Sequence, residues 1–359
     1  MKKKSILEAN VLYTLIAIII GFIIGAVFLT IAGISPAVAY GKLIDGVIGK
    51  PKYMIWTLVY ASPLIFTGLS VAFSLRTGVF NIGAEGQFVV GALAACAVGI
   101  LVDLPAILHA PLCILAAAAA GFFWSYLVGL MKVKRGIHEV LSYIMFNWLA
   151  FYLSNYMVNT QALHKEGDGE ATKNVLDSAR LLLPEGMLKA LNCTGANWGF
   201  ILAIAVAIAI WVIIEKTTLG YKLKAVGFNR EAATFGGINA DKSILTALGI
   251  SGALAGIGGA VQILGMGGRI SQFAGQEGYG FQGITVALIA GSNPIGCIFS
   301  GIFYGAMKYG GSKLTIVGAP EEVIDIIMGC VIIFIAISQV FKRIFIRTAG
   351  LGAKRKEAK

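Results

Sequence analysis

Two acidic residues stand between glycines, each at the edge of a long apolar run. Glu85 lies in the Gly-x-Glu-Gly motif at 83–86, and Glu277 lies in a second copy at 275–278. A carboxylate is costly to bury in hydrocarbon, and glycine weakens a helix. Broken helices at corresponding positions in two halves of a chain are typical of solute pathways through membranes. The two motifs therefore predict polar entries into such a pathway.

Polar side chains near the two motifs and within one apolar run are predicted to line this pathway. They are Asn81, Glu85, Gln87, Asn147, Gln276, Glu277 and Gln282. A second interpretation stays open for Glu85 and Glu277, because a carboxylate in the first turn of a helix favours the helix dipole without any solute. For Asn147 we favour a hydrogen bond to another helix over a bond to a solute.

The composition places these motifs in an all-α integral membrane protein. The chain is 57% hydrophobic and only 13% charged, whereas soluble domains carry about 25% charged residues. Its apolar runs do not alternate as barrel strands do, so helices must satisfy the backbone polar groups in lipid. The net charge of +11 predicts basic cytoplasmic loops rather than binding of nucleic acid, since no soluble basic domain is present. The five cysteines are scattered, so neither a disulfide framework nor a metal site is expected.

About ten transmembrane helices are predicted, with the eighth too short to cross unless it continues backward as a broken helix. The spans lie at roughly 11–33, 54–75, 83–101, 107–130, 139–158, 197–214, 243–264, 281–292, 295–312 and 322–341. With both termini in the cytoplasm, the cytoplasmic segments hold 19 of the 29 Lys and Arg residues, as the positive-inside rule requires. Residues 35–53 are predicted to form a helix on the outer face, and 160–196 a solvated outer cap.

A second pair of motifs predicts an internal repeat in this single transmembrane domain, 1–359. The run at 139–145 matches the run at 322–328 in four of seven residues, at an offset of 183 residues against 192 for the glutamate motifs. Spans 2–5 then correspond to spans 7–10. Because five spans separate the copies, the halves 1–160 and 197–341 are predicted to be inverted, with broken helices near the centre.

The predicted cytoplasmic loop at 215–242 contains the signals of a short capped helix. Asn229 is a suitable N-cap, and Gly236 or Gly237 a suitable end. Such a helix suits docking into a groove on a soluble partner, although an ordinary interfacial helix is the alternative. The predicted docking residues are Asn229, Arg230, Glu231, Ala232, Ala233, Thr234, Phe235, Gly236 and Gly237. A basic cytoplasmic tail is predicted at 342–359.

No catalytic constellation is found, and the sequence has no Gly-x-x-x-x-Gly-Lys-Ser/Thr loop for binding ATP. Neither catalytic nor metal-binding residues are therefore predicted, and the chain is not expected to be an enzyme. If transport depends on ATP, the ATP must be hydrolysed by another polypeptide.

Three motifs carry a resemblance to a known family. The pattern Ala-Val-Gly-x-Asn-x-x-Ala-Ala-x-x-x-Gly-Ile at 225–238 resembles the coupling loop of permeases from ABC importers of the ribose, branched-chain amino acid and nucleoside group. The segments 80–87 and 278–288 resemble the nucleoside branch of that group. The resemblance covers about residues 55–340.

The resemblance implies a bacterial plasma-membrane importer with several subunits. A second, often non-identical, permease would complete the pathway, and cytoplasmic ATPase subunits would dock on residues 229–237. An external binding lipoprotein would deliver a nucleoside. This chain would bind no cofactor, and ATP would be used by the partner. Two alternatives remain: an ion-coupled secondary transporter using Glu85 and Glu277 as proton or sodium sites, and a simple sugar as the substrate.

Overall fold

The computed structural model describes residues 10–165, 167, 169–318, 322–335 and 337. The predicted basic tail and the end of the predicted tenth span lie outside them. Two compact units divide the chain, one of Met1–Gly49 with Met307–Lys359 and the other of Lys50–Ala306. Every regular element in the described part of the chain is a helix, and the β-type pairing in this part consists of isolated β-bridges between single residues. The predicted all-α class is therefore confirmed.

The first unit contains α1 (Asn10–Ile31), α2 (Pro36–Ile48), a helix over 322–335 and the short η4 (Leu314–Val317). Glycines of α1 lie directly against the 322–335 helix. A Cβ on Gly21 would lie 2.3 Å from Cγ2 of Val331, and one on Gly25 would lie 2.4 Å from Cγ1 of Ile327. The Gly-x-x-x-Gly spacing thus permits close helix packing. The helix predicted within 35–53 forms as α2, with Pro36 in its first turn.

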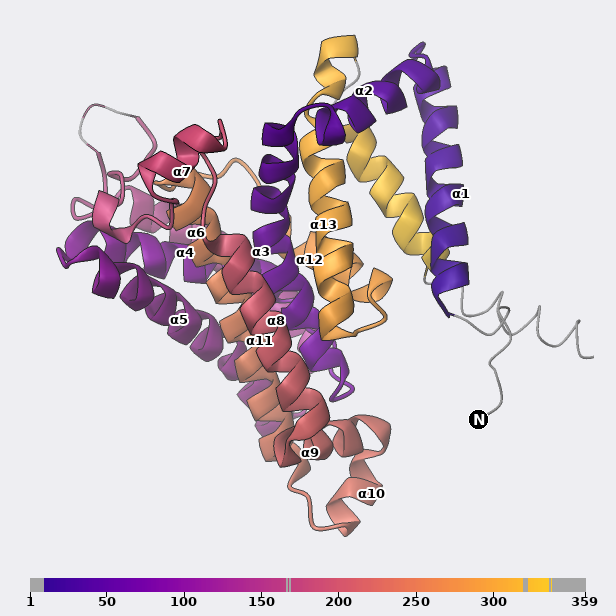
Figure 1. The fold of residues 1–359 in the computed structure, drawn as a ribbon. Coiled ribbons are helices and arrows are strands. Elements are labelled where there is room, and N and C mark those ends of the chain that lie inside the picture. Colours follow the sequence, from indigo (N-terminus) through magenta and orange to yellow (C-terminus); the bar gives the residue numbers. More distant parts are fainter. Residues whose placement is uncertain (1–9, 166, 168, 319–321, 336, 338–359) are drawn as a thin grey trace, which may run out of the picture. The chain divides into compact units, whose positions relative to one another are not determined.

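The second unit contains most of the predicted spans (Figure 1). Its longer helices are α3 (Pro51–Leu75), α4 (Ala84–Leu101), α5 (Ala106–Arg135), α6 (Glu139–Val158), α8 (Gly199–Lys216), α9 (Thr218–Phe228), α11 (Ala240–Gln262) and α12 (Tyr279–Ile289). Shorter elements are η2 (Asp177–Ala179), α7 (Glu185–Ala190), α10 (Arg230–Phe235) and the π-helical η3 (Ile263–Gly267). The last helix, α13 (Pro294–Gly311), begins in this unit and ends in the other.

Each predicted span coincides with a helix as far as its residues are described, and among these residues six helices are long and apolar enough to cross a membrane. The chain is therefore a multi-pass membrane protein, while the number of ten crossings and the inverted halves stay predictions. The predicted fifth span, α6, is less apolar than these six, because Asn147, Ser154 and several tyrosines interrupt its hydrophobic residues.

The centre of the second unit is a crossing of α4, α5 and α11 in which backbones touch. A Cβ on Gly121 of α5 would lie 2.3 Å from the Gly252 carbonyl oxygen, and one on Gly256 would lie 2.3 Å from the Ala117 carbonyl oxygen. A Cβ on Gly91 of α4 would lie 2.3 Å from Cα of Gly256. Only glycine allows three helices to approach this closely. The Gly252 and Gly256 pair of α11 therefore serves close helix packing.

The segment 160–196, which the sequence predicts as a solvated cap, has many exposed residues but is also anchored to the rest of this unit. Its backbone bonds to the turn after α11, because the Val175 N–H donates to the Gly268 carbonyl at 2.8 Å and the Leu181 N–H to the Leu264 carbonyl at 3.0 Å. Val175, Ala179 and Leu181 are buried. Most charged side chains of this segment are exposed, whereas these three apolar side chains pack inward, and composition averages over this difference.

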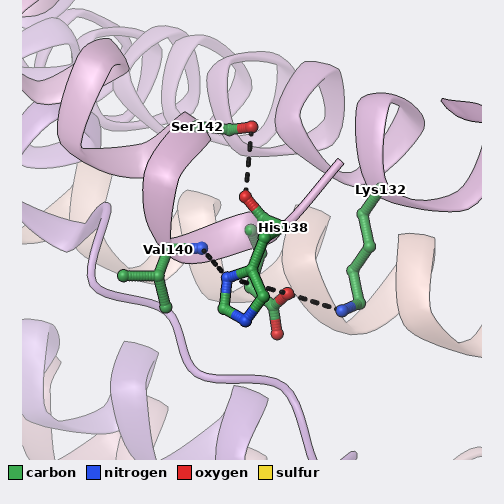
Figure 2. A network of polar contacts seen from close by, with 5 residues as sticks. Lys132, His138, Val140 and Ser142 are labelled. Carbon is green, nitrogen blue, oxygen red and sulfur yellow. Dashed lines mark hydrogen bonds and ion pairs between the residues drawn. The ribbon is translucent and has the colours of Figure 1, made fainter. Parts of the chain in front are cut away.

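The turn between α5 and α6 is fixed by polar contacts that Figure 2 shows. Lys132 Nζ forms an ion pair with Glu139 at 2.5 Å, and His138 Nδ1 accepts a hydrogen bond from the Val140 N–H at 3.3 Å. Gly136 takes the left-handed conformation that ends α5. The His138 side chain is 73% exposed, so it lies at the surface. These contacts set the start of α6, the helix that carries Asn147.

Candidate functional site at the broken helix

The helix break predicted before the eighth span is confirmed. α11 ends in the π-helical η3, residues 268–278 are not helical, and α12 then runs for only 11 residues. Gly278 precedes α12 with φ 84°, a conformation that favours glycine. π-helical turns and helix breaks inside membrane proteins concentrate at functional sites.

Glu85 binds the start of this short helix. It belongs to the first turn of α4 and is only 1% exposed. Its Oε1 accepts from the Gly278 N–H and its Oε2 from the Gly280 N–H, both at 2.7 Å. A carboxylate here satisfies free backbone donors and favours the positive end of the α12 dipole. The first Gly-x-Glu-Gly motif therefore holds the second one, a relation that neither interpretation of Glu85 anticipated.

Close packing accompanies this bond. A Cβ on Gly280 would lie 2.1 Å from the Glu85 backbone nitrogen, so only glycine brings α12 this near to α4. The rings of Phe88 and Tyr279 stack beside it, with centroids 5.1 Å apart and planes 14° apart. The junction of the two helices is thus fixed by charge, backbone contact and aromatic stacking together.

Asn81 and Gln87 belong to a buried amide and hydroxyl network next to Glu85. The two amides exchange hydrogen bonds, from Asn81 Nδ2 to Gln87 Oε1 at 2.8 Å and from Gln87 Nε2 to Asn81 Oδ1 at 2.9 Å. Asn81 Nδ2 also reaches the hydroxyls of Ser251 at 2.6 Å and Ser70 at 3.2 Å. The network links α3, α4 and α11. Neither serine was predicted from the sequence, where the available signal was a hydroxyl inside an apolar helix.

Asn147 acts between helices, as the favoured interpretation predicts. Its Oδ1 accepts from the Gly86 N–H at 2.9 Å, and its Nδ2 donates to the Ile82 carbonyl at 3.1 Å. One buried side chain thereby satisfies a free donor at the start of α4 and a carbonyl of the preceding turn.

The seven predicted pathway residues fall into two groups. Asn81, Glu85, Gln87 and Asn147 are buried and hydrogen-bonded within the chain. The other group, Gln276, Glu277 and Gln282, is half-buried around the start of α12. A pathway role stays a prediction for all seven. Among the described residues, no group of three His, Cys, Asp or Glu side chains is arranged to hold a metal ion.

The predicted coupling segment forms two helices, α9 and α10, at the lower end of this unit in Figure 1. Asn229 caps α10, since its Oδ1 accepts from the Ala232 N–H at 2.9 Å, and Gly236 follows the last turn. Both boundaries are confirmed. The helix α9, whose pattern is interrupted by glycines, was not predicted, and Ala233 of the predicted docking residues is buried.

Two aromatic side chains on these helices are almost fully exposed. Phe228 is 90% exposed and Phe235 93% exposed, and Ala232 of α10 is also exposed. Large exposed apolar side chains on a short helix are typical of a surface that a partner covers.

A broken helix inside an all-helical membrane unit, with a capped helix at one end, is typical of the membrane subunits of transporters. The chain belongs to the family described as the branched-chain amino acid transport system / permease component, whose model matches residues 53–336. It is therefore a permease component of a membrane transport system.

Three curated relatives are similar over most of the chain. The guanosine ABC transporter permease protein NupP of Bacillus subtilis (strain 168) is 37% identical over 347 residues, covering 96% of this chain and 98% of NupP. The glucose ABC transporter permease protein TsgB13 of Haloferax volcanii is 33% identical, covering 89% and 85%. NupQ, a second guanosine ABC transporter permease protein of Bacillus subtilis, is 29% identical, covering 73% and 81%. No solved structure matches this chain.

Proposed function

We propose that this chain is the membrane-spanning permease subunit of an ATP-driven importer of nucleosides. The observation that carries the proposal is its similarity to NupP, which extends over nearly the whole of both chains. The broken helix supports the same function, because non-helical backbone within a membrane unit is tolerated where it lines a pathway or is buried in protein.

The proposed assembly contains a second, non-identical permease. NupP and NupQ belong to one bacterium, and both are similar to this chain. Since this sequence contains no loop for binding ATP, a separate ATPase subunit would hydrolyse the ATP, and it would dock on α10. An external lipoprotein would deliver the nucleoside. The distribution of Lys and Arg supports cytoplasmic termini in a bacterial plasma membrane.

The proposed mechanism is alternating access. Closure of the ATPase pair moves α10, and the two permeases rock around a central pathway into which the binding protein releases the substrate. The half-buried residues near the start of α12, Gln276, Glu277 and Gln282, would face this pathway, while the buried Asn81, Glu85, Gln87 and Asn147 would hold its wall in shape. An amide or carboxylate suits hydrogen bonding to ribose hydroxyls.

Uptake by the complete assembly in liposomes tests this function. We expect uptake of labelled guanosine that requires ATP inside the vesicle with the ATPase, and competition by unlabelled nucleosides but not by glucose or leucine. Competition by glucose alone would indicate that the substrate is a sugar, as the name of TsgB13 states for that relative. Uptake driven by a proton or sodium gradient without ATP would replace the proposal with secondary transport.

Replacing Ala232 with aspartate should prevent docking of the ATPase. Ala232 is exposed on α10, and a carboxylate there is costly to bury in an apolar interface. We expect loss of co-purification with the ATPase and loss of uptake, while the chain still folds and inserts. Ala190→Asp is the matched control, because Ala190 is exposed on α7, outside the coupling segment. Normal stimulation of the ATPase by Ala232→Asp would contradict docking at α10.

A further inference from the structure

The turn between α3 and α4 touches the coupling helices on one side. A Cβ on Gly227 of α9 would lie 2.3 Å from the Arg76 carbonyl oxygen. A Cβ on Gly78, whose φ is 73°, would lie 3.3 Å from Cα of Gly227. The two backbones therefore meet with no side chain between them, so a displacement of α9 cannot be absorbed by a change of rotamer.

A buried apolar cluster extends this contact to α10. Ala233 of α10, Val226 of α9, Val79 of the turn and Tyr143 of α6 belong to one cluster, and each is at most 6% exposed. The Tyr143 ring lies against Gly83, where a Cβ would be 2.0 Å from the ring. The only buried residue of α10 is thus packed with the segment that leads to Glu85.

The same segment holds α12 at both ends. Glu85 accepts from two backbone N–H groups at the start of α12. Arg76 Nε donates to the carbonyl of Ser292, just beyond the end of this helix, at 3.0 Å. Asn81 stiffens the stretch between them, because its Oδ1 also accepts from the Gly83 N–H at 3.0 Å. Residues 76–85 therefore form a bracket with α12 on one side and α9 on the other.

We propose that this bracket, residues 76–85, makes α12 follow the coupling helices, with Arg76 and Glu85 as its positioning residues. Arg76 holds the turn that follows α12 at the Ser292 carbonyl, and Glu85 completes the amide end of the helix. A push on α9 and α10 then moves α12 as a rigid body and changes the pathway at residues 276–282. The inference rests on the proposed function, because it assigns the route by which ATPase movement reaches the pathway.

The test compares nucleoside transported per ATP hydrolysed in the reconstituted assembly. Glu85→Gln keeps the size of the side chain but leaves one oxygen to accept, and Arg76→Met removes the donor. We expect each to lower nucleoside transported per ATP about tenfold, since a hydrogen bond to a charged group is lost, while stimulated ATPase activity stays within about twofold. Arg76→Lys, which retains a donor, should recover part of the loss. Glu185→Gln, on the exposed face of α7, is the control.

Hydrogen exchange of α12 amides provides a second readout that does not depend on transport. Gly227→Ala inserts a methyl group between α9 and the bracket, far along the chain from α12. We expect faster exchange at residues 278–283 in Gly227→Ala and in Glu85→Gln, but not in Gly186→Ala, whose Cβ meets open space. The double variant should exchange no faster than the more affected single variant, because both changes break one linkage.

The outcomes separate the bracket from the proposed function. If nucleoside transported per ATP hydrolysed is unchanged in both Glu85→Gln and Arg76→Met, the bracket is overturned. The proposed function is not, provided that the unaltered assembly takes up nucleoside. Unchanged exchange of α12 in Gly227→Ala would also overturn it. If the unaltered assembly transports no nucleoside, the proposed function fails, and hydrogen exchange still decides whether α9 and α12 are linked.

Discussion

Replacing Gly256 by leucine is expected to prevent the chain from folding. The Cβ of any side chain at this position would lie 2.3 Å from the Ala117 carbonyl oxygen, and α4 approaches on another side through Gly91. Both neighbours are backbone, so no rotamer change makes room. Overpacking a core costs about 1–3 kcal/mol where side chains can move, and more is expected where helices must separate. That is a large part of an ordinary folding free energy of about 5–15 kcal/mol.

The folded yield after membrane extraction and the thermal unfolding midpoint measure this effect. Gly329→Leu is the matched control, because Gly329 lies in the 322–335 helix and no atom of the described residues lies within 4 Å of its Cβ position. We expect Gly329→Leu to fold at the normal yield and Gly256→Leu to be lost. An unaltered midpoint for Gly256→Leu would show that α4, α5 and α11 do not pack as described.

Asn81→Leu is expected to give the second largest effect, by breaking the buried polar network. Leucine has a similar volume, so the main loss is hydrogen bonding rather than packing. The Gln87 amide and the Gly83 N–H lose partners inside the protein. Each buried polar group left without a partner costs about 1–3 kcal/mol, so the two together cost roughly 2–6 kcal/mol. Uptake should fall in parallel, because the bracket loses the residue that stiffens it.

Denaturant unfolding in detergent, with the transition followed by tryptophan fluorescence, measures the loss. Asn159→Leu is the control, since Asn159 is exposed and its side-chain amide donates to the Asn155 carbonyl one turn earlier in α6. Combining Asn81→Leu with Ser251→Ala should cost less than the sum of the two single changes, because both belong to one network. Strict additivity would mean that Asn81 and Ser251 do not act together.

Features that depend on local sequence were predicted well. The apolar runs identified the helices, Asn229 and Gly236 identified the ends of α10, and the glycines at 275–278 identified the helix break. Each depends on residues within a few positions of one another, through capping, helix propensity and hydropathy. Two features escaped prediction: α9, whose glycines weaken its helical pattern, and the inward packing of 160–196, which depends on hydrogen bonds to the distant turn after α11.

Only the tertiary structure decided how the polar residues are used. Glu85 and Gly278 are 193 residues apart, and Asn81 and Ser251 are 170 apart, so no local pattern brings either pair together. Sequence alone established that a membrane chain carries two carboxylates between glycines. The packing of α4 against α12 determined that Glu85 satisfies the backbone of the other motif, because a buried carboxylate takes the donors that the fold brings within reach.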